Sequence, residues 1–356
     1  MTELLTGGRD KVMFVTFAPG HFSASRRIDD AESERFVLEP FAVQGDKVAE
    51  SIVRRIVSGR YLRLFKAIVT TRAKAVWVWG HDAGFVASLA ALLRPDVRLI
   101  WDISDVNRHL LDRGMKGRVL RALERLLIRR AQRLLLTSSQ FYDHHYAGFV
   151  DSSRVRVVEN RRSPRQRSTA TEAPTAGPLR VIFAGIFRSP AVLKIIGDVA
   201  ERLGTVEFDL FGYANRSVPE GLLAELIGDH PNVHLHGPYD AANIGALYES
   251  AHFVWGFVDP AENDNEKWLL SNRLYDAIVT RRPVITNAGT ASGDYTLENH
   301  LGLAVAMDGK AIAEALTLYL DPGGPAYREL ARGMPEPSTG YMSGEYARVI
   351  AEVLDE

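Results

Sequence analysis

The chain has no cysteine among its 356 residues. This absence excludes a disulfide framework, a thiolate nucleophile and a cysteine-based metal site. Long apolar runs are missing as well: no stretch reaches the roughly 18 apolar residues of a membrane-spanning helix, and residues 1–10 lack the apolar core of a signal peptide. We therefore expect a protein without a membrane span, in a reducing compartment such as the cytoplasm.

An excess of charge of one sign is also missing. The 43 Lys and Arg residues nearly cancel the 44 Asp and Glu residues, for a net charge of −1, which argues against a dedicated nucleic-acid binder. Hydrophobic residues at 46% and charged residues at 24% are typical of a folded globular protein. A chain of this length exceeds a single comfortable core, so two domains are expected.

The first half alternates apolar strand-like runs with helical patterns. We expect strands at 12–17, 76–80, 99–102 and 133–138, and helices at 46–72, 82–93 and 115–131. Continuous apolar strands separated by helices indicate a parallel sheet that is covered on both faces. The sequence thus predicts an α/β domain that is Rossmann-like, although no G-x-G-x-x-G loop follows its first strand.

A segment rich in Pro and small polar residues separates this half from a second α/β series. Residues 161–178 have the composition of a linker. Beyond it we expect strands at 179–185, 206–211, 233–236, 253–257 and 283–286, and helices at 190–202, 218–228, 240–249 and 268–280. The final segment, 343–355, also has a helical pattern. No internal sequence repeat relates the two halves.

One segment of the second half, residues 265–276, combines charged side chains with the start of a helix. It reads Asn-Glu-Lys-Trp-Leu-Leu-Ser-Asn-Arg-Leu-Tyr-Asp, and Pro283 ends the helix before a short apolar strand. In an α/β domain this order places a carboxylate and several hydrogen-bond donors at the carboxyl edge of a sheet, where ligands bind.

The order of an acidic loop, Asn-Arg-Leu-Tyr-Asp at 272–276 and Pro-Val-Ile at 283–285 resembles the donor-binding segment of glycosyltransferases with the GT-B architecture. The resemblance is closest to the glycosyltransferase family 4-like (group 1) enzymes. It covers most of the second half and the strand–helix order of the first. It implies two Rossmann-like domains whose parallel sheets face each other across a cleft.

The resemblance also implies a role for each part of the chain. Residues 1–162 would be the acceptor-binding domain, 163–178 the linker and 179–340 the nucleotide-sugar-binding domain, with 341–356 a helix that packs back on the first domain. The implied reaction moves a sugar from a nucleotide-diphosphate-sugar, such as a UDP-sugar, to a hydroxyl of a polysaccharide, lipid-linked or natural-product acceptor. A bacterial origin fits such a pathway.

The donor side is expected to use a turn after the strand at 179–185. Gly185 lets backbone amides approach a phosphate, and Arg188 can pair with the diphosphate near a helix N-terminus. Lys194 is a second cation candidate, although its spacing departs from the family pattern. Tyr213 follows the next strand, where the resemblance places the nucleotide base.

The segment at 265–276 supplies the other donor candidates. The resemblance places Asp276 at the ribose hydroxyls. The family pattern pairs two glutamates seven residues apart, whereas Glu266 lies ten residues before Asp276, so Glu266 either contacts the sugar or faces water. Asn272 and Arg273 either hold the diphosphate or cap the loop.

The first domain carries the candidates for catalysis and for the acceptor. His81 follows a strand and opens a helix, where the resemblance implies a contact to the transferred sugar. Asp102 and Asp105 follow the next strand, and either is a candidate base if the reaction inverts the anomeric centre; a retaining reaction needs no such base. The polar loop at 19–27 contributes acceptor-side candidates: Gly20, His21, Arg26 and Arg27.

No Asp-x-Asp motif ends a strand, so we expect no metal ion and no cofactor, with the diphosphate stabilised by cations and helix ends. Two alternatives stay open: a nucleotide-sugar epimerase of the same shape, and a non-catalytic protein that binds a nucleotide sugar or partners a transferase.

The helix at 117–136 bears an arginine stripe beside apolar residues. Such a helix either rests peripherally on anionic lipid or packs on the sheet with solvated arginines.

Overall fold

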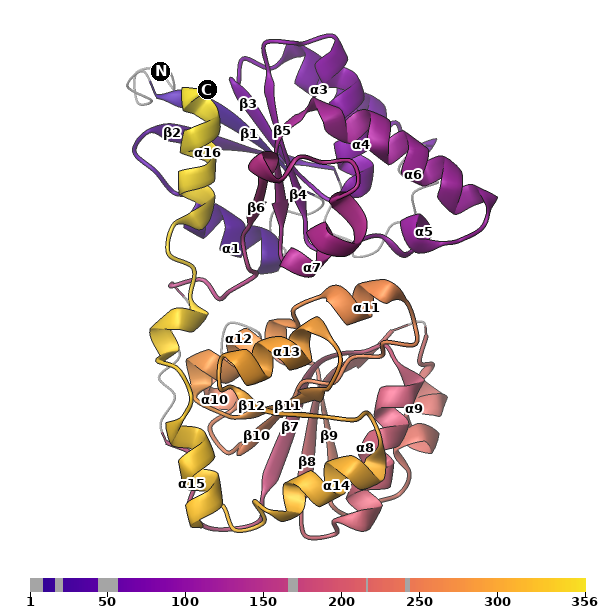
Figure 1. Cartoon of the computed structure of the whole chain (residues 1–356), viewed down its shortest axis with the longest axis vertical. Coiled ribbons are helices and arrows are strands. Elements are labelled where there is room, and N and C mark those ends of the chain that lie inside the picture. The colour runs from indigo at the N-terminus through magenta and orange to yellow at the C-terminus, as the bar shows by residue number, and fades with distance from the viewer. Residues whose placement is uncertain (1–8, 17–21, 44–56, 166–171, 216, 241–243) are drawn as a thin grey trace. The chain divides into compact units, whose positions relative to one another are not determined.

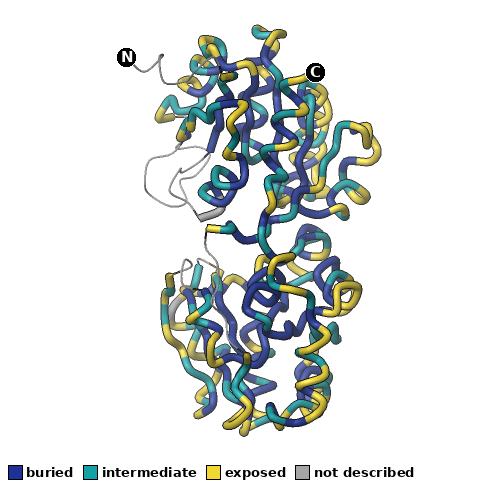
Figure 2. Tube along the Cα trace, turned by 90° about the vertical axis from the view of Figure 1, so that its left-hand side faces the viewer, coloured by how far each residue is buried: buried dark blue, intermediate teal, exposed yellow. Residues whose placement is uncertain are grey.

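The computed structural model describes residues 9–16, 22–43, 57–165, 172–215, 217–240 and 244–356 (Figure 1). It divides into two compact units. The first comprises Met1–Ser163 together with Met342–Glu356, and the second comprises Pro164–Tyr341. In both units the central strands are mostly buried, and the helices expose their outer faces (Figure 2).

The first unit contains a six-stranded sheet in the order β2-β1-β3-β4-β5-β6, and every strand pairs in parallel with its neighbours. The strands are β1 (Asp10–Thr16), β2 (Phe36–Ala42), β3 (Ala75–Trp79), β4 (Arg98–Ile103), β5 (Ala131–Leu136) and β6 (Val155–Val157). β2 and β6 were not predicted. Pro40 lies within β2, which is compatible with a strand because β2 is at the edge of the sheet.

Helices cover both faces of this sheet. They are α1 (Phe22–Asp30), α3 (Arg60–Thr70), α4 (His81–Leu92), α5 (Arg108–Leu111), α6 (Met115–Leu127), α7 (Ser139–Phe141) with a π-helical continuation at Tyr142–Tyr146, and α16 (Glu345–Asp355). The part of the predicted helix at 46–56 lies outside the described residues. α4 can pack closely on β4 because Gly84 has no side chain: a Cβ atom there would lie 1.2 Å from Nε1 of Trp101.

The C-terminal helix α16 belongs to the first unit. Tyr346, Val349 and Ile350 lie in one apolar cluster with Phe14 and Trp77 of β1 and β3. The ring of Tyr346 stacks on that of Trp77 at 4.9 Å between centroids. α16 therefore completes the apolar face that α1 covers only in part.

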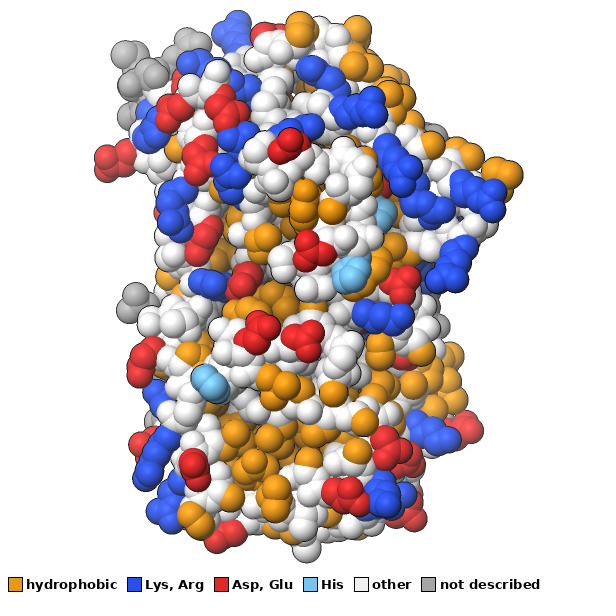
Figure 3. Space-filling view, viewed as in Figure 1, with side chains coloured by type: hydrophobic (Ala, Val, Ile, Leu, Met, Phe, Trp, Pro, Cys, Tyr) orange, Lys and Arg blue, Asp and Glu red, His pale blue; other side chains and the backbone are white. Residues whose placement is uncertain are grey.

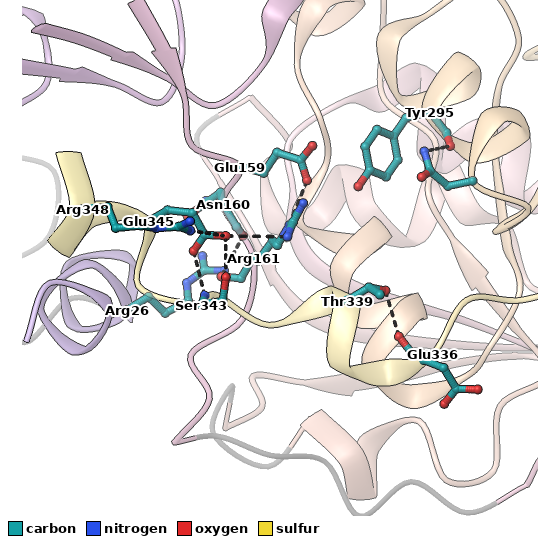
Figure 4. A network of polar contacts seen from close by, with 11 residues as sticks. Arg26, Glu159, Asn160, Arg161, Tyr295, Glu336, Thr339, Ser343, Glu345 and Arg348 are labelled. Carbon is teal, nitrogen blue, oxygen red and sulfur yellow. Dashed lines mark hydrogen bonds and ion pairs between the residues drawn. The ribbon is translucent and has the colours of Figure 1, made fainter.

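Polar contacts fix the chain where it enters α16. Both carboxylate oxygens of Asp30, at the end of α1, accept backbone hydrogen bonds: Oδ1 from Gly344 at 2.6 Å and Oδ2 from Tyr346 at 2.8 Å. Nearby, Arg161 pairs with Glu345 at 3.7 Å (Figure 4). Asp30 thus replaces the missing side-chain cap of α16, whose own N-cap residue is Gly344.

The second unit repeats the architecture with the strand order β12-β11-β10-β7-β8-β9, again all parallel. The strands are β7 (Arg180–Phe187), β8 (Glu207–Ala214), β9 (Val233–Gly237), β10 (Phe253–Trp255), β11 (Val284–Asn287) and β12 (Gly302–Val305). β12 was not predicted. The helices are α8 (Pro190–Arg202), α9 (Glu220–Ile227), α10 (Ile244–Leu247), α11 (Asp264–Trp268), α12 (Asn272–Thr280), α13 (Ala291–Glu298), α14 (Gly309–Thr317) and α15 (Pro325–Arg332).

Two apolar clusters lie on opposite faces of this second sheet. One joins Val181 and Leu210 to α8 and α14, and the other joins Ile182 and Val254 to α10 and α12 (Figure 1). The single helix predicted at 268–280 is in fact two helices, α11 and α12, with a break at 269–271. The predicted fold class, α/β with two Rossmann-like units, is confirmed. Within the described residues, no helix is both long and apolar enough to cross a membrane.

Asp30→Ala leaves two backbone amides at the start of α16 without their acceptors. We expect the first unit to lose about 1–3 kcal/mol of stability. Asp30→Asn keeps one acceptor oxygen and should lose less. Urea unfolding followed by tryptophan fluorescence measures both, with the exposed neighbour Glu34→Ala as the control. An Asp30→Ala protein as stable as the control would contradict the capping role.

Candidate functional site

The turn between β7 and α8 differs from the prediction in one respect. β7 continues to Phe187, so Gly185 lies inside the strand and not in the turn. Gly185 faces Gly212 of β8, and a Cβ atom at Gly212 would lie 1.7 Å from the carbonyl oxygen of Gly185. The pair of glycines thus permits a close approach of two strands, and the turn itself consists of Arg188 and Ser189.

That turn has the features of an anion site. Ser189 caps α8 by accepting a hydrogen bond from the amide of Val192 at 3.2 Å, and it donates to Asp259 at 2.8 Å. Pro190 is the first residue of the helix, a position that suits proline. The side chain of Arg188 is 56% exposed at this helix N-terminus. An exposed guanidinium beside the partial positive charge of a helix N-terminus suits a phosphate group.

Arg273 of α12 lies behind this turn and is already engaged. Its guanidinium donates to the carbonyl oxygens of Trp255 at 3.0 Å and Phe257 at 2.9 Å, and it lies 4.7 Å from the ring centre of Phe183. Burial, reinforced by the positive charge of Arg188, lowers the pKa of Arg273 to about 10. Arg273 therefore fixes the chain that follows β10 and adds positive charge behind Arg188.

Glu266 joins the same group from α11. Its side chain is 8% exposed, and Oε1 lies 4.0 Å from Nη1 of Arg188. The structure thus brings together three of the predicted donor residues: Arg188, Glu266 and Arg273.

The remaining donor candidates lie near the same edge of the sheet but in different settings. Asp276 is buried in α12 at 3% exposure, one turn after the exposed Asn272. Tyr213 is 52% exposed in β8, one residue before the strand ends, and Lys194 is exposed on α8. Among the described residues, no hydrogen bond or ion pair links Tyr213 or Lys194 to Arg188.

In the first unit, the structure corrects the prediction for Arg26 and Arg27. They were expected in an exposed polar loop, but α1 begins at Phe22 and buries both side chains, to 1% and 0% exposure. Nη1 of Arg26 donates to the carbonyl oxygens of Asn160 at 2.8 Å and Arg161 at 3.1 Å. Arg26 thus holds the end of the first unit (Figure 4). The other two acceptor-side candidates, Gly20 and His21, lie outside the described residues.

Arg27 forms a buried ion pair with Asp102 of β4. Its Nε donates to Oδ2 at 2.8 Å and its Nη2 to Oδ1 at 3.2 Å. Burial lowers the pKa of Arg27, but the charge and hydrogen bonds of Asp102, together with the nearby Tyr346 and Asp105, outweigh burial and raise the pKa above its ordinary value. Trp77 also donates to Asp102, at 3.2 Å. Both oxygens of Asp102 are therefore engaged, which does not suit a base for an acceptor hydroxyl; Asp105 is exposed.

His81 is the first residue of α4 and belongs to a buried polar cluster that the sequence reading missed. Its Nε2 lies 3.1 Å from the Tyr146 hydroxyl and 3.3 Å from Oε1 of Glu124. His145 reaches the other oxygen of Glu124 at 2.8 Å. Glu124 lies at a buried position of the otherwise basic helix α6. A single acid in a basic helix was the only sign of this cluster in the sequence, because His145 and His81 are 21 and 43 residues away from Glu124.

The two neighbouring histidines stabilise the ionised form of Glu124. Burial acts to raise its pKa, but hydrogen bonds with His145 and His81 outweigh burial and lower the pKa to about 2. Burial and the charge of Glu124 raise the pKa of Tyr146 well above its usual value, so its phenol stays protonated. Across the described residues, no group of three or more His, Asp or Glu side chains has a metal-binding arrangement.

Asp102→Ala leaves the buried Arg27 without its counter-charge. We expect a loss of about 3–5 kcal/mol in stability, measured by urea unfolding. The control is Glu34→Ala, an exposed acid of the same unit that is not among the groups acting on Arg27, which should change stability by no more than about 0.5 kcal/mol. A stable Asp102→Ala protein would show that the ion pair is dispensable for folding.

Comparisons with known proteins show what this chain is similar to. Residues 8–161 match the model of the Glycosyl transferase 4-like domain. The chain is 25% identical over 239 residues to the succinoglycan biosynthesis protein ExoL of Rhizobium meliloti (strain 1021), an alignment that covers 64% of this chain. The chain spans only 58% of the length of that relative.

Solved structures share the fold over nearly the whole chain. Anabaena HepE in complex with UDP and glucose has a TM-score of 0.73 at 13% identity, covering 98% of this chain and 100% of HepE. The UDP-GlcNAc 2-epimerase of Neisseria meningitidis, bound to UDP-GlcNAc, has a TM-score of 0.63 at 14% identity, covering 97% and 99%. The GT-B fold that the sequence suggested is confirmed, and the match of residues 8–161 supports the suggested resemblance to glycosyl transferase 4-like proteins.

Proposed function

We propose that the protein is a glycosyltransferase that moves a sugar from a UDP-sugar to an acceptor hydroxyl. One observation carries the proposal: Arg188, Glu266 and Arg273 come together beside the N-terminus of α8, at the carboxyl edge of the second sheet. In parallel α/β sheets this edge is where ligands bind.

The diphosphate is the group that this arrangement suits. When the glycosidic bond to a nucleotide diphosphate breaks, negative charge develops on the leaving phosphate. Arg188 has an exposed guanidinium to pair with that charge, the N-terminus of α8 adds partial positive charge, and Arg273 supplies a further positive charge nearby. These cations account for leaving-group stabilisation without a metal ion, so we propose a metal-independent reaction.

The other donor residues are assigned by their positions. Asp276 would accept hydrogen bonds from the ribose hydroxyls, and Tyr213, half-exposed near the end of β8, would stack on the base. Glu266 would contact the transferred sugar while holding Arg188 in place. Asn272 and Lys194, both exposed, remain secondary candidates for phosphate contacts.

The first unit would supply the acceptor side. We assign His81 to a sugar hydroxyl. Because Arg27 and Trp77 occupy the oxygens of Asp102, the exposed Asp105 is the better base if the reaction inverts configuration. Gly20 and His21 remain candidates for acceptor contacts.

The comparisons support the donor and acceptor classes in this proposal. HepE was solved with UDP and glucose, which favours a uridine nucleotide. The name of ExoL refers to succinoglycan biosynthesis, which favours a growing polysaccharide or its lipid-linked precursor as the acceptor.

The epimerase alternative also has support, since the UDP-GlcNAc 2-epimerase has the same fold. Incubation with UDP-glucose and UDP-GlcNAc, followed by chromatography of the nucleotides, separates the possibilities. A transferase releases UDP when it transfers the sugar to an added acceptor, or to water in place of the acceptor. An epimerase yields a new UDP-sugar with no UDP, and a non-catalytic protein binds UDP and returns the donor unchanged.

Helix α6 favours contact with an anionic membrane surface, where a lipid-linked acceptor would reside. The sequence left open whether its apolar stripe packs on the sheet or faces outward; Met115, Val119 and Leu126 are 71%, 59% and 63% exposed. Exposed basic residues flank the stripe: Lys116, Arg118, Arg125 and Arg129. Figure 3 shows basic and hydrophobic side chains gathered over this helix. Apolar side chains among cations suit the headgroup region of a membrane.

Arg188→Gln removes the charged donor that we assign to the diphosphate. We expect UDP to bind about 10- to 100-fold more weakly, while the affinity for uridine, which has no phosphate, stays the same. Titration calorimetry measures both ligands, and Lys310→Gln, exposed on α14, is the control. Equal UDP affinity in Arg188→Gln and the parent would remove Arg188 from the site.

Asp276→Asn tests the ribose contact. The variant should bind UDP about tenfold more weakly, because hydrogen bonds to a charged acceptor are lost. Its affinity for 2′,3′-dideoxy-UDP should equal that of the parent, since this ligand has no ribose hydroxyls. The same loss with both ligands would instead indicate a general disturbance of α12.

Membrane contact is tested by sedimentation with vesicles of phosphatidylcholine, with and without phosphatidylglycerol. We expect binding only to the anionic vesicles, and each of Arg118→Gln and Arg125→Gln should weaken it about fivefold, at about 1 kcal/mol per cation. Val119→Ser should also weaken binding, whereas Leu318→Ser, an equally exposed apolar residue on the second unit, should not. Binding that is independent of phosphatidylglycerol would contradict the proposal.

A further inference from the structure

The buried cluster around Glu124 determines which nitrogen of His81 carries a proton. Glu124 is fully buried and ionised, so both of its oxygens can only accept hydrogen bonds. The hydroxyl of Tyr146 has a single proton, which it donates to Oε1 of Glu124 at 3.1 Å. Nε2 of His81 therefore faces two groups that can only accept from it, Tyr146 and Glu124. Nε2 must carry the proton.

The neighbouring helices decide where a second proton would go. His81 is the first residue of the 12-residue helix α4, where the partial positive charge of the helix N-terminus disfavours an imidazolium ion. His145 lies in the last turn of the helical segment Ser139–Tyr146, where a cation is favoured. The positions of the two rings at the helix ends therefore favour a compensating positive charge on His145 rather than on His81.

A neutral imidazole with its proton on Nε2 has a lone pair on Nδ1. No described residue makes a hydrogen bond to that nitrogen. His81 retains a 7% exposed edge beyond the end of β3, at the carboxyl edge of the first sheet. Nδ1 is consequently an acceptor available to a ligand hydroxyl, whereas a histidine in the other tautomer would offer a donor there.

We propose that Glu124 is a positioning residue: it holds His81 as the neutral Nε2–H tautomer, so that Nδ1 accepts a hydrogen bond from a sugar hydroxyl. The identity of the ligand rests on the proposed function, but the tautomer does not. In this arrangement His81 accepts a hydrogen bond from the sugar hydroxyl instead of donating one to it. The hydroxyl belongs either to the sugar of the donor or to the acceptor.

The tautomer can be observed directly. In protein labelled with ¹⁵N-histidine, two-bond ¹H–¹⁵N spectra near neutral pH distinguish the two neutral tautomers and the imidazolium ion. His81→Asn assigns the signal among the ten histidines of the chain. We expect a protonated Nε2 and a bare Nδ1. A protonated Nδ1 in the parent protein, neutral or charged, would overturn the proposal whatever the variants do.

Two variants separate positioning from packing. Glu124→Gln keeps the shape but offers an amide that both donates and accepts, so the His81 signal should shift toward the other tautomer. Tyr146→Phe removes a hydroxyl of the same cluster but leaves the carboxylate, so the Nε2–H tautomer should remain. A folded Glu124→Gln protein with an unchanged His81 tautomer would also overturn the proposal.

Ligand binding then identifies the hydroxyl. Glu124→Gln should bind UDP as the parent does, because the nucleotide is assigned to the second unit. If His81 contacts the donor sugar, the variant should bind UDP-glucose about three- to tenfold more weakly. If it contacts the acceptor, UDP-glucose affinity should be unchanged and the rate of transfer should fall. Failure of the parent to bind UDP at all would count against the proposed function and leave the tautomer result standing.

Discussion

Arg27 is fully buried in the first unit, and its charge is balanced only because Asp102 lies beside it. An unpaired charge at this depth costs several kcal/mol, so the elements that carry the two residues must stay in register. Arg27 comes from α1 and Asp102 from β4. Trp79 of β3 and Tyr346 of α16 lie over the guanidinium at 4.6 Å and 5.6 Å. One ion pair thus links four elements, including a helix more than 300 residues further along the chain.

The second unit uses a buried arginine in a different way. Arg273 has no carboxylate within salt-bridge distance among the described residues, and its donors satisfy the carbonyl oxygens that end β10. Neutral acceptors stabilise a cation less well than a carboxylate does, which agrees with a lowered pKa for Arg273 and a raised pKa for Arg27. The positive charge of Arg273 therefore remains uncompensated, and a site next to it is favourable for a phosphate.

The central strands could be predicted from the sequence because buried parallel strands are continuous apolar runs, whereas the GT-B class was implied by the resemblance of residues 265–285 to known glycosyltransferases. The edge strand β2 could not, since Pro40 and Glu39 interrupt its pattern. Adjacent arginines usually indicate an exposed surface, and only the tertiary partners of Arg26 and Arg27 bury them. Glu124 was missed for a similar reason: its role depends on residues 81 and 145, which are distant in sequence and meet only in the fold.

These contacts distinguish residues that maintain the fold from those that remain available to a ligand. Asp102 and Arg273 have their polar groups engaged by the protein, so changing either residue alters the walls of a site before it alters chemistry. Arg188 and Asp105 are exposed, and His81 keeps one nitrogen for a partner because Glu124 occupies the other. A chain that matched the family only at its fixed residues would keep the GT-B fold without activity. Whether the protein catalyses a reaction therefore depends on the residues that remain available to a ligand, and the family resemblance alone does not identify them.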